Sequence, residues 1–235
     1  EDLTGQSLYK KGKLEIIVVN SGSGQDEEAI VKKFQQKYDN IKYIKTEERE
    51  TIYKAWNRAI KAASGKYITN ANTDDRHAPH MLERLAVELE RNEDIAAVYS
   101  HFYVTTVENQ TWETKTPERM SDWHPPYSRE ALLKGNFMGP QPMWRKSLHD
   151  EYGYFDQTLK VSGDYEFFLR VSQTHNFLLI PEPLGLYLFS PNSLERTAGT
   201  RDEEDERIWN LYRNNKHKII CRPFRPDDPT FSIQT

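Results

Sequence analysis

Short apolar runs alternate with longer amphipathic stretches over the first half of the chain, and this alternation constrains the fold most. Residues 14–19 and 41–44 are rich in β-branched residues and have the length of buried strands, and residues 66–72 and 95–105 continue the series. The stretch 52–63 between them carries apolar residues at helical spacing. Strands that alternate with helices predict a three-layer α/β fold with a mostly parallel central sheet.

The regular alternation of apolar and amphipathic stretches ends after residue 107. Residues 108–139 are rich in Trp, Pro and Glu without a sustained period, which predicts an excursion over one sheet edge. Regular patterns then return, and they predict strands at 143–147, 177–180 and 184–190 and helices at 164–174 and 202–212. No repeat or linker interrupts the chain, so we expect one domain over 1–218, followed by a C-terminal tail or linker over 219–235.

Composition excludes several classes of protein. The 235 residues include a single cysteine, Cys221, so neither an intramolecular disulfide nor a thiolate metal cage can form. Acidic residues outnumber basic ones, 36 to 32, which argues against nucleic acid as a partner. The seven histidines are scattered and predict no zinc site. No apolar run approaches the length of a transmembrane segment, so we expect a cytoplasmic protein, with the inner membrane face as an alternative position.

Two acidic residues follow the third predicted strand, in the string Asn72-Thr73-Asp74-Asp75. Ligands of open α/β sheets bind outside the carboxyl ends of the strands, and carboxylates suit Mg²⁺ or Mn²⁺. Adjacent aspartates before a helix are also ordinary N-capping residues. The residues alone leave a metal site and a helix cap open.

Asp164 follows Gly163 at the predicted first turn of an otherwise apolar helix. The helix N-terminus stabilises a carboxylate as the anion, and an ionised aspartate can accept a proton from a hydroxyl group. Here too the spacing is equally compatible with a helix cap.

Several strings, in this order along the chain, resemble family 2 glycosyltransferases of the GT-A fold, the SpsA-like nucleotide-diphospho-sugar transferases. The resemblance covers about residues 1–212 and rests on residues 15–23, 51–69, 73–75, 152–156 and 163–170. Their combined order is more specific than any one string.

The resemblance implies roles for named residues. Asp74 and Asp75 fall at the DxD-type motif, where they would hold a divalent metal, Mn²⁺ or Mg²⁺, on the nucleotide diphosphate, with Asp74 also reaching the ribose. Asp164 falls at the catalytic base, which implies inversion of configuration. Arg49 is a candidate phosphate contact, whereas Arg58 is better explained as a solvated helix charge.

The chain departs from the family pattern in three places. The usual first strand is apparently missing, so the chain would be part of a longer polypeptide or another segment would fill that place. Asn20 and Ser21 stand in the nucleotide-sugar-binding turn, where the family commonly has Asp-Asp. Asn can donate and accept hydrogen bonds, so base contact is retained as an expectation. Residues 187–190 lack the histidine that the family often carries there.

The acceptor is expected to bind near the irregular middle segment. Trp112, Trp123, Tyr127 and Trp144 are the aromatic candidates for stacking on sugar rings, and we single out Trp144 as lining the acceptor pocket.

The resemblance therefore implies an inverting, metal-dependent glycosyltransferase of the hexosyltransferase type. It would transfer sugar from a nucleotide-diphosphate sugar to a glycan or lipid-linked acceptor in cell-surface polysaccharide biosynthesis. One alternative is a catalytically idle nucleotide-sugar or glycan binding module. A less favoured one is a sugar-phosphate nucleotidyltransferase, whose glycine-rich phosphate loop is not visible in the sequence.

Overall fold

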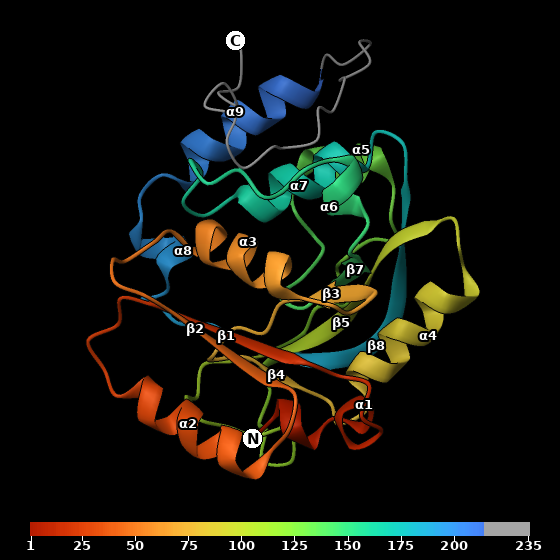
Figure 1. Cartoon of the computed structure of the whole chain (residues 1–235). Helices are drawn as coiled ribbons and strands as arrows, with labels where there is room; N and C mark the ends of the chain where they lie inside the picture. Colours follow the sequence, from red (N-terminus) through yellow and green to blue (C-terminus); the bar gives the residue numbers. More distant parts are fainter. Residues whose placement is uncertain (214–235) are drawn as a thin grey trace.

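The computed structural model describes residues 1–213, in which two β-sheets form the centre and helices cover them from several sides (Figure 1). The predicted tail over 219–235 lies outside the described residues. The chain opens with a 3-10 turn, η1 (Leu3–Gly5), and a short helix, α1 (Ser7–Lys10), before its first strand.

The smaller sheet pairs β1 (Ile16–Ser21) with β2 (Ile41–Thr46) in parallel, with helix α2 (Glu27–Lys37) as the crossover. Helix α3 (Ile52–Ala62) packs on β1, and Figure 1 shows α2 and α3 on opposite sides of this sheet. Thr51 caps α3 by accepting a hydrogen bond from the Lys54 amide. Within residues 1–213, β1 pairs only with β2.

The larger sheet is mixed. Its order is β3-β7-β5-β8-β4, with β6 paired to β5. The strands are β3 (Tyr67–Thr69), β4 (Arg76–His77), β5 (Ile95–Thr105), β6 (Arg119–Met120), β7 (Met143–Arg145) and β8 (Asn176–Leu188).

The two longest ladders, β1–β2 and β5–β8, are parallel, whereas β3, β4, β6 and β7 pair antiparallel. The sheet is therefore less parallel than the sequence predicts. Antiparallel neighbours need no crossover helix, so short segments that return through loops can join the two long strands from the opposite direction.

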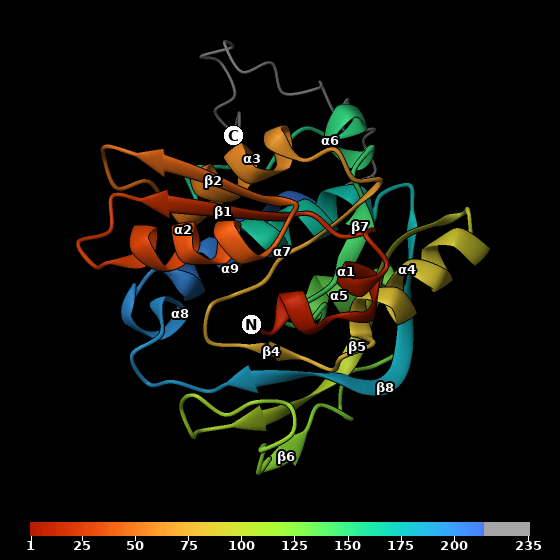
Figure 2. The ribbon, with the colours of Figure 1, turned by 60° about the horizontal axis from the view of Figure 1, so that its bottom comes forward.

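One predicted boundary is wrong. The sequence predicts two strands, at 177–180 and 184–190. In the structure β8 is one strand that includes residues 181–183 (Figure 2). Its pairing with β5 shifts register near Pro181 and Pro183. This bulge accommodates prolines, which lack the N–H that a regular ladder requires.

The remaining helices lie around the larger sheet or pack on one another. They are α4 (Met81–Arg91), α5 (Arg129–Lys134), α6 (Leu148–Glu151), α7 (Gly163–Val171), α8 (Leu194–Thr197) and α9 (Arg201–Arg213). One hydrophobic cluster gathers around Trp144, Phe167 and Phe168, and a second lies under α4. Of the helices in residues 1–213, none combines the length and apolarity of a membrane span.

Candidate active site

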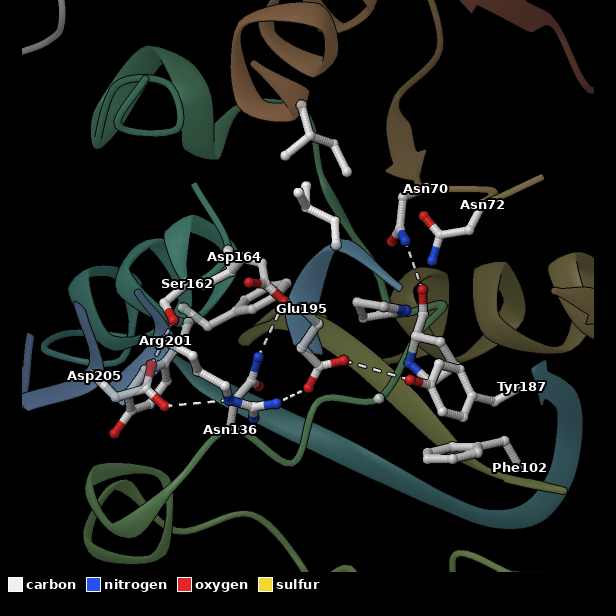
Figure 3. A pocket seen from close by; sticks show the side chains of 18 of the residues that line it. Asn70, Asn72, Phe102, Asn136, Ser162, Asp164, Tyr187, Glu195, Arg201 and Asp205 are labelled. Atoms are coloured by element: carbon white, nitrogen blue, oxygen red, sulfur yellow. Dashed lines mark hydrogen bonds and ion pairs between the residues drawn. The ribbon is translucent and has the colours of Figure 1, made fainter. Parts of the chain in front are cut away.

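A cavity of about 350 Å³ opens at one edge of the larger sheet, between α3, the start of α7 and the segment that carries α8 (Figure 3). Its polar lining residues include Tyr53, Asn70, Asn72, Asn136, Asp164, Tyr187, Glu195 and Arg201. The volume falls in the range of small-molecule sites.

Asp164 points toward this cavity from the first turn of α7 (Figure 3). Its Oδ1 accepts a hydrogen bond from the Tyr53 hydroxyl at 3.1 Å, and its Oδ2 accepts one from Asn136 Nδ2 at 3.0 Å. Burial raises the pKa of Asp164, while these hydrogen bonds and the Tyr165 backbone amide act in the opposite direction. The Asp164 carboxylate is therefore largely withdrawn from water, and both of its oxygens are held by hydrogen bonds.

The loop before α7 is fixed by a carboxylate from α9. Glu204 is 9% exposed and accepts hydrogen bonds from three successive backbone amides, those of Lys160, Val161 and Ser162, at 2.8 to 3.0 Å. The Ser162 hydroxyl donates to the neighbouring Asp205. Helix α9 thus determines where the Asp164 end of α7 lies.

A buried ion pair holds the middle of α7. Arg170 donates to both oxygens of Glu166, at 3.0 and 2.6 Å, and to the carbonyl of Tyr154. The hydroxyl of Tyr212, on α9, donates to Glu166 at 2.6 Å. The hydrogen bonds satisfy charges whose burial would otherwise be costly.

The two aspartates after β3 have different environments. Asp75 is 3% exposed, and its oxygens accept hydrogen bonds from Asn72 Nδ2 at 2.9 Å and from the Leu188 amide at 3.0 Å. Burial raises the pKa of Asp75 to about 6. Asp74 is exposed, and no described residue donates a hydrogen bond to its carboxylate. Neither caps the next helix, because the N-cap of α4 is His80, so the capping alternative is wrong for this pair.

The structure brings Asn20, Ser21 and Arg49 together. The amide of Glu50 donates to Ser21 Oγ at 2.5 Å, and Asn20 Oδ1 accepts from the Ser23 amide at 3.1 Å. Gly22 has φ +58°, and a Cβ there would lie 2.7 Å from the backbone nitrogen of Arg49, so this turn requires glycine. Arg49 is exposed beside the turn.

Arg58 forms a two-point ion pair with Glu50, with both distances 2.6 Å. Its side chain is therefore engaged within the protein, as expected for a helix charge rather than a phosphate contact.

The predicted nucleotide and metal residues do not line the cavity that contains Asp164. Of these residues, Asp75 is connected to the cavity through Asn72, which lines the cavity and donates to Asp75. Their assignment to nucleotide and metal binding stays a prediction.

The cavity aromatics differ in exposure. Trp144 lines the cavity but is only 2% exposed, and its indole N–H donates to His149 Nε2 at 2.9 Å. Trp123 lines the same cavity and is 53% exposed, with the Arg119 guanidinium over its ring. Trp123 therefore offers more surface to a ligand than Trp144 does. The acceptor role of Trp144 stays a prediction.

The sequence reasoning missed Tyr53, Asn136 and Glu204. Tyr53 lies within the string 51–60 that carries the family resemblance, but nothing in that string indicates contact with a residue 111 positions later. Asn136 lies in the irregular middle segment, and Glu204 is one of several acidic residues in α9, so neither shows a local signal.

Comparisons with known proteins agree with this fold. A protein-family model described as Glycosyl transferase family 2 matches residues 1–155. A protein of Methanocaldococcus jannaschii named as a glycosyltransferase is 29% identical over 211 residues, which cover 86% of this chain and 70% of the relative. An Escherichia coli protein whose name places it in colanic acid biosynthesis is 29% identical over 131 residues, covering 56% of this chain and 46% of the relative.

Among solved structures, the complex of S. aureus TarS 1–349 with UDP-GlcNAc matches with a TM-score of 0.71 and 18% identity. The match covers 90% of this chain and 59% of that chain, so the present chain spans less than two thirds of the TarS fragment. The likeness confirms the predicted GT-A fold.

Proposed function

Because the chain belongs to glycosyl transferase family 2, we propose that it is an inverting, metal-dependent glycosyltransferase that moves a sugar from a nucleotide-diphosphate sugar to an acceptor hydroxyl. The observation that carries this proposal is Asp164, a carboxylate that faces a 350 Å³ cavity and is held there by two neutral donors. The complex of TarS with UDP-GlcNAc supports a nucleotide sugar as donor.

Asp164 acts as the general base in this reaction. It accepts the proton of the acceptor hydroxyl while the hydroxyl oxygen forms its bond to the anomeric carbon. The bond from that carbon to the diphosphate breaks, and its electron pair leaves with the diphosphate. A single displacement of this kind inverts the configuration at the anomeric carbon.

The residues after β3 fit a divalent cation that is shared with substrate phosphates. Asp74 offers a free, exposed carboxylate, whereas both oxygens of Asp75 already accept hydrogen bonds from the protein. Mg²⁺ and Mn²⁺ commonly take one or two carboxylates together with phosphate oxygens, so Asp74 is the primary ligand and Asp75 orients its loop. When bound, such a cation neutralises the charge that develops on the leaving diphosphate.

The remaining assignments follow the same proposal. The turn of Asn20 and Ser21 contacts the nucleotide, Arg49 contacts its phosphates, and the acceptor is a glycan or a lipid-linked sugar. The name of the Escherichia coli relative supports a role in cell-surface polysaccharide biosynthesis, with the enzyme in the cytoplasm at the inner membrane face.

The donor class and the metal are tested together by calorimetry. We expect one of UDP, GDP and dTDP to bind, and to bind at least tenfold more weakly when EDTA replaces Mn²⁺. The variant Asp74→Asn should lose most of this metal dependence, whereas Asp94→Asn, a change at an exposed site outside the cavity, should keep it. Affinity that is equal with Mn²⁺ and with EDTA would exclude the metal role of Asp74.

The role of Asp164 as the base is tested with the nucleotide-diphosphate sugar whose nucleotide binds. Turnover here means the rate at which this donor is hydrolysed or its sugar is transferred. Asp164→Asn preserves the size of the side chain and removes the base, so we expect turnover to fall by about 10²- to 10⁴-fold with unchanged nucleotide affinity. Asp150→Asn, an exposed change on α6, is the matched control. Full turnover by Asp164→Asn would contradict the assignment, and nucleotide binding without turnover by the wild-type chain would favour the idle binding module.

A further inference from the structure

We propose that Tyr53 and Asn136 are positioning residues for the Asp164 carboxylate, which they orient toward the cavity and favour in its ionised form. The inference rests on the proposed function, since it concerns the group to which that function assigns the acceptor proton.

The two donors come from separate parts of the fold and bind different oxygens. Tyr53, on α3, donates to Oδ1, and Asn136, in the segment after α5, donates to Oδ2. Bonds to both oxygens from two directions restrict rotation of the carboxylate about its Cβ–Cγ bond. A carboxylate has about four acceptor sites, so a substrate hydroxyl can still approach beside these donors and the Tyr165 amide.

Tyr53 has little freedom to move. Its side chain is 3% exposed, and its ring packs against Trp56 and Phe155 at centroid distances of 5.6 and 5.8 Å. The ring also lies directly over Gly163, where a Cβ would come within 2.7 Å of it. The glycine before Asp164 therefore provides the space that lets the hydroxyl of Tyr53 reach the carboxylate.

Asn136 is held in one orientation of its amide. Its Oδ1 accepts a hydrogen bond from the Met138 amide at 3.1 Å, which leaves Nδ2 directed at Asp164. Figure 3 shows Asn136 beside Asp164, with a dashed line marking the hydrogen bond between them. Both donors are thus fixed by the surrounding structure before any substrate binds.

The donors are neutral, and this matters for a base. Among the described residues Asp164 forms no ion pair. A cationic partner would stabilise the anion strongly and weaken its basicity, whereas neutral donors offset the cost of burial to a smaller extent. Asp164 therefore keeps a pKa raised by burial, and it is more basic than an aspartate held in an ion pair would be.

Other titratable groups line the same cavity and must be considered in any pH experiment. Tyr165 lies on α7, Lys160 precedes that helix, and Glu195, Arg201 and Asp205 come from α8 and α9. Arg201 pairs with both Glu195 and Asp205, and the cavity is also lined by Arg119, His124, Tyr187 and Arg196. The experiment therefore follows the ionisation of Asp164 itself.

The test measures the pKa of Asp164 in the whole protein by NMR of ¹³C-labelled aspartate carboxyl groups, with Asp164→Asn used to assign the resonance. We expect Tyr53→Phe and Asn136→Ala each to raise the pKa by about one, because each removes a hydrogen bond to a charged group. The acid limb of the pH profile of turnover should move to higher pH by a similar amount. Tyr53→Phe retains the packed ring, so its fold is expected to persist.

Tyr165→Phe is the matched control. It also removes a tyrosine hydroxyl at the cavity, but that hydroxyl donates to the Leu133 carbonyl rather than to Asp164. A pKa of Asp164 that stays within about 0.3 of the wild-type value in both test variants would overturn the inference, since a merely structural role leaves the ionisation unchanged. A raised pKa together with full turnover in Asp164→Asn would instead support the positioning and contradict the proposed function.

Discussion

A neutral histidine is built into the core beneath the cavity. His149 is 3% exposed and stacks between Tyr154 and Phe167, with ring centroids 5.3 and 4.8 Å away. Its Nε2 accepts from the indole N–H of Trp144, which can only donate, so the ring proton lies on Nδ1, facing the Gly153 carbonyl. Protonation would break the bond to Trp144.

This environment makes the protein sensitive to acid. Burial lowers the pKa of His149 to about 4, below the value of about 6.5 expected in the unfolded chain. The unfolded state therefore binds the extra proton first, and the free energy of unfolding falls as the pH drops from 6.5 toward 4, by about 3 kcal/mol over that interval.

Urea unfolding between pH 7 and 4.5 measures the effect. We expect His149→Gln to be less stable than the wild type at pH 7. Below pH 6.5 its free energy of unfolding should fall less steeply than that of the wild type. His80→Gln, at an exposed position, should show the same fall in the free energy of unfolding as the wild type. If the free energy of unfolding has the same pH dependence in the wild type and in His149→Gln, His149 is not the cause of the acid sensitivity.

At the residue scale, local sequence was sufficient for some of the site and not for the rest. Gly163 and the apolar helix single out Asp164 but leave a helix cap equally open, and only the family resemblance implies its role as a base. The structure places Asp164 at the cavity. The exposure of Trp123 and the burial of Trp144 could not be read from the sequence, because both depend on which tertiary surface covers each ring. The contact between Tyr53 and Asp164 has no local signature for the same reason.

At the scale of elements, α9 acts as a clamp on α7. Glu204 holds the amides of residues 160–162, and Tyr212, two turns further along α9, holds Glu166 on α7. A helix whose sequence looks merely charged thus determines the position of the helix that carries Asp164.

Glu204→Gln tests this clamp. The variant replaces one acceptor oxygen by an N–H₂ group that faces backbone donors, so we expect a loss of stability of about 1–3 kcal/mol and a fall in turnover. Glu203→Gln, the exposed neighbour on the same helix, should change neither. Urea unfolding and turnover of both variants decide the matter, and equal behaviour of the two would contradict the clamp.

Some of the helices and strands could be predicted from periodicity, whereas the pairing of the strands could not. The structure has β1, β2, α3, β5 and α9 within about two residues of the expected bounds. The antiparallel joining of β7 between β3 and β5 depends on the path of an irregular segment that has no period. The continuity of β8 through two prolines depends on a bulge, and the sequence shows the prolines as a break.

At the scale of the whole molecule, the cavity is assembled from distant stretches of chain. Residues matched by the family model supply Tyr53, Asn70, Asn72 and Asn136, and residues after 155 supply Asp164 and the wall formed by α8 and α9. The fold was predictable because the motifs that carry the family resemblance occur in the family's order along the chain. The cavity was not, because it exists only where those stretches meet.

The turn at Asn20 and the aspartates after β3 precede residue 155, whereas Asp164 and the helix that clamps it follow that residue. Under the proposed roles, leaving-group recognition and nucleophile activation are therefore encoded in successive parts of the chain. Each part can accumulate substitutions without directly altering the other, provided that Tyr53 and Asn136 still donate their hydrogen bonds to Asp164. A chain organised in this way can vary the part that carries the base while the part that binds the donor stays unchanged.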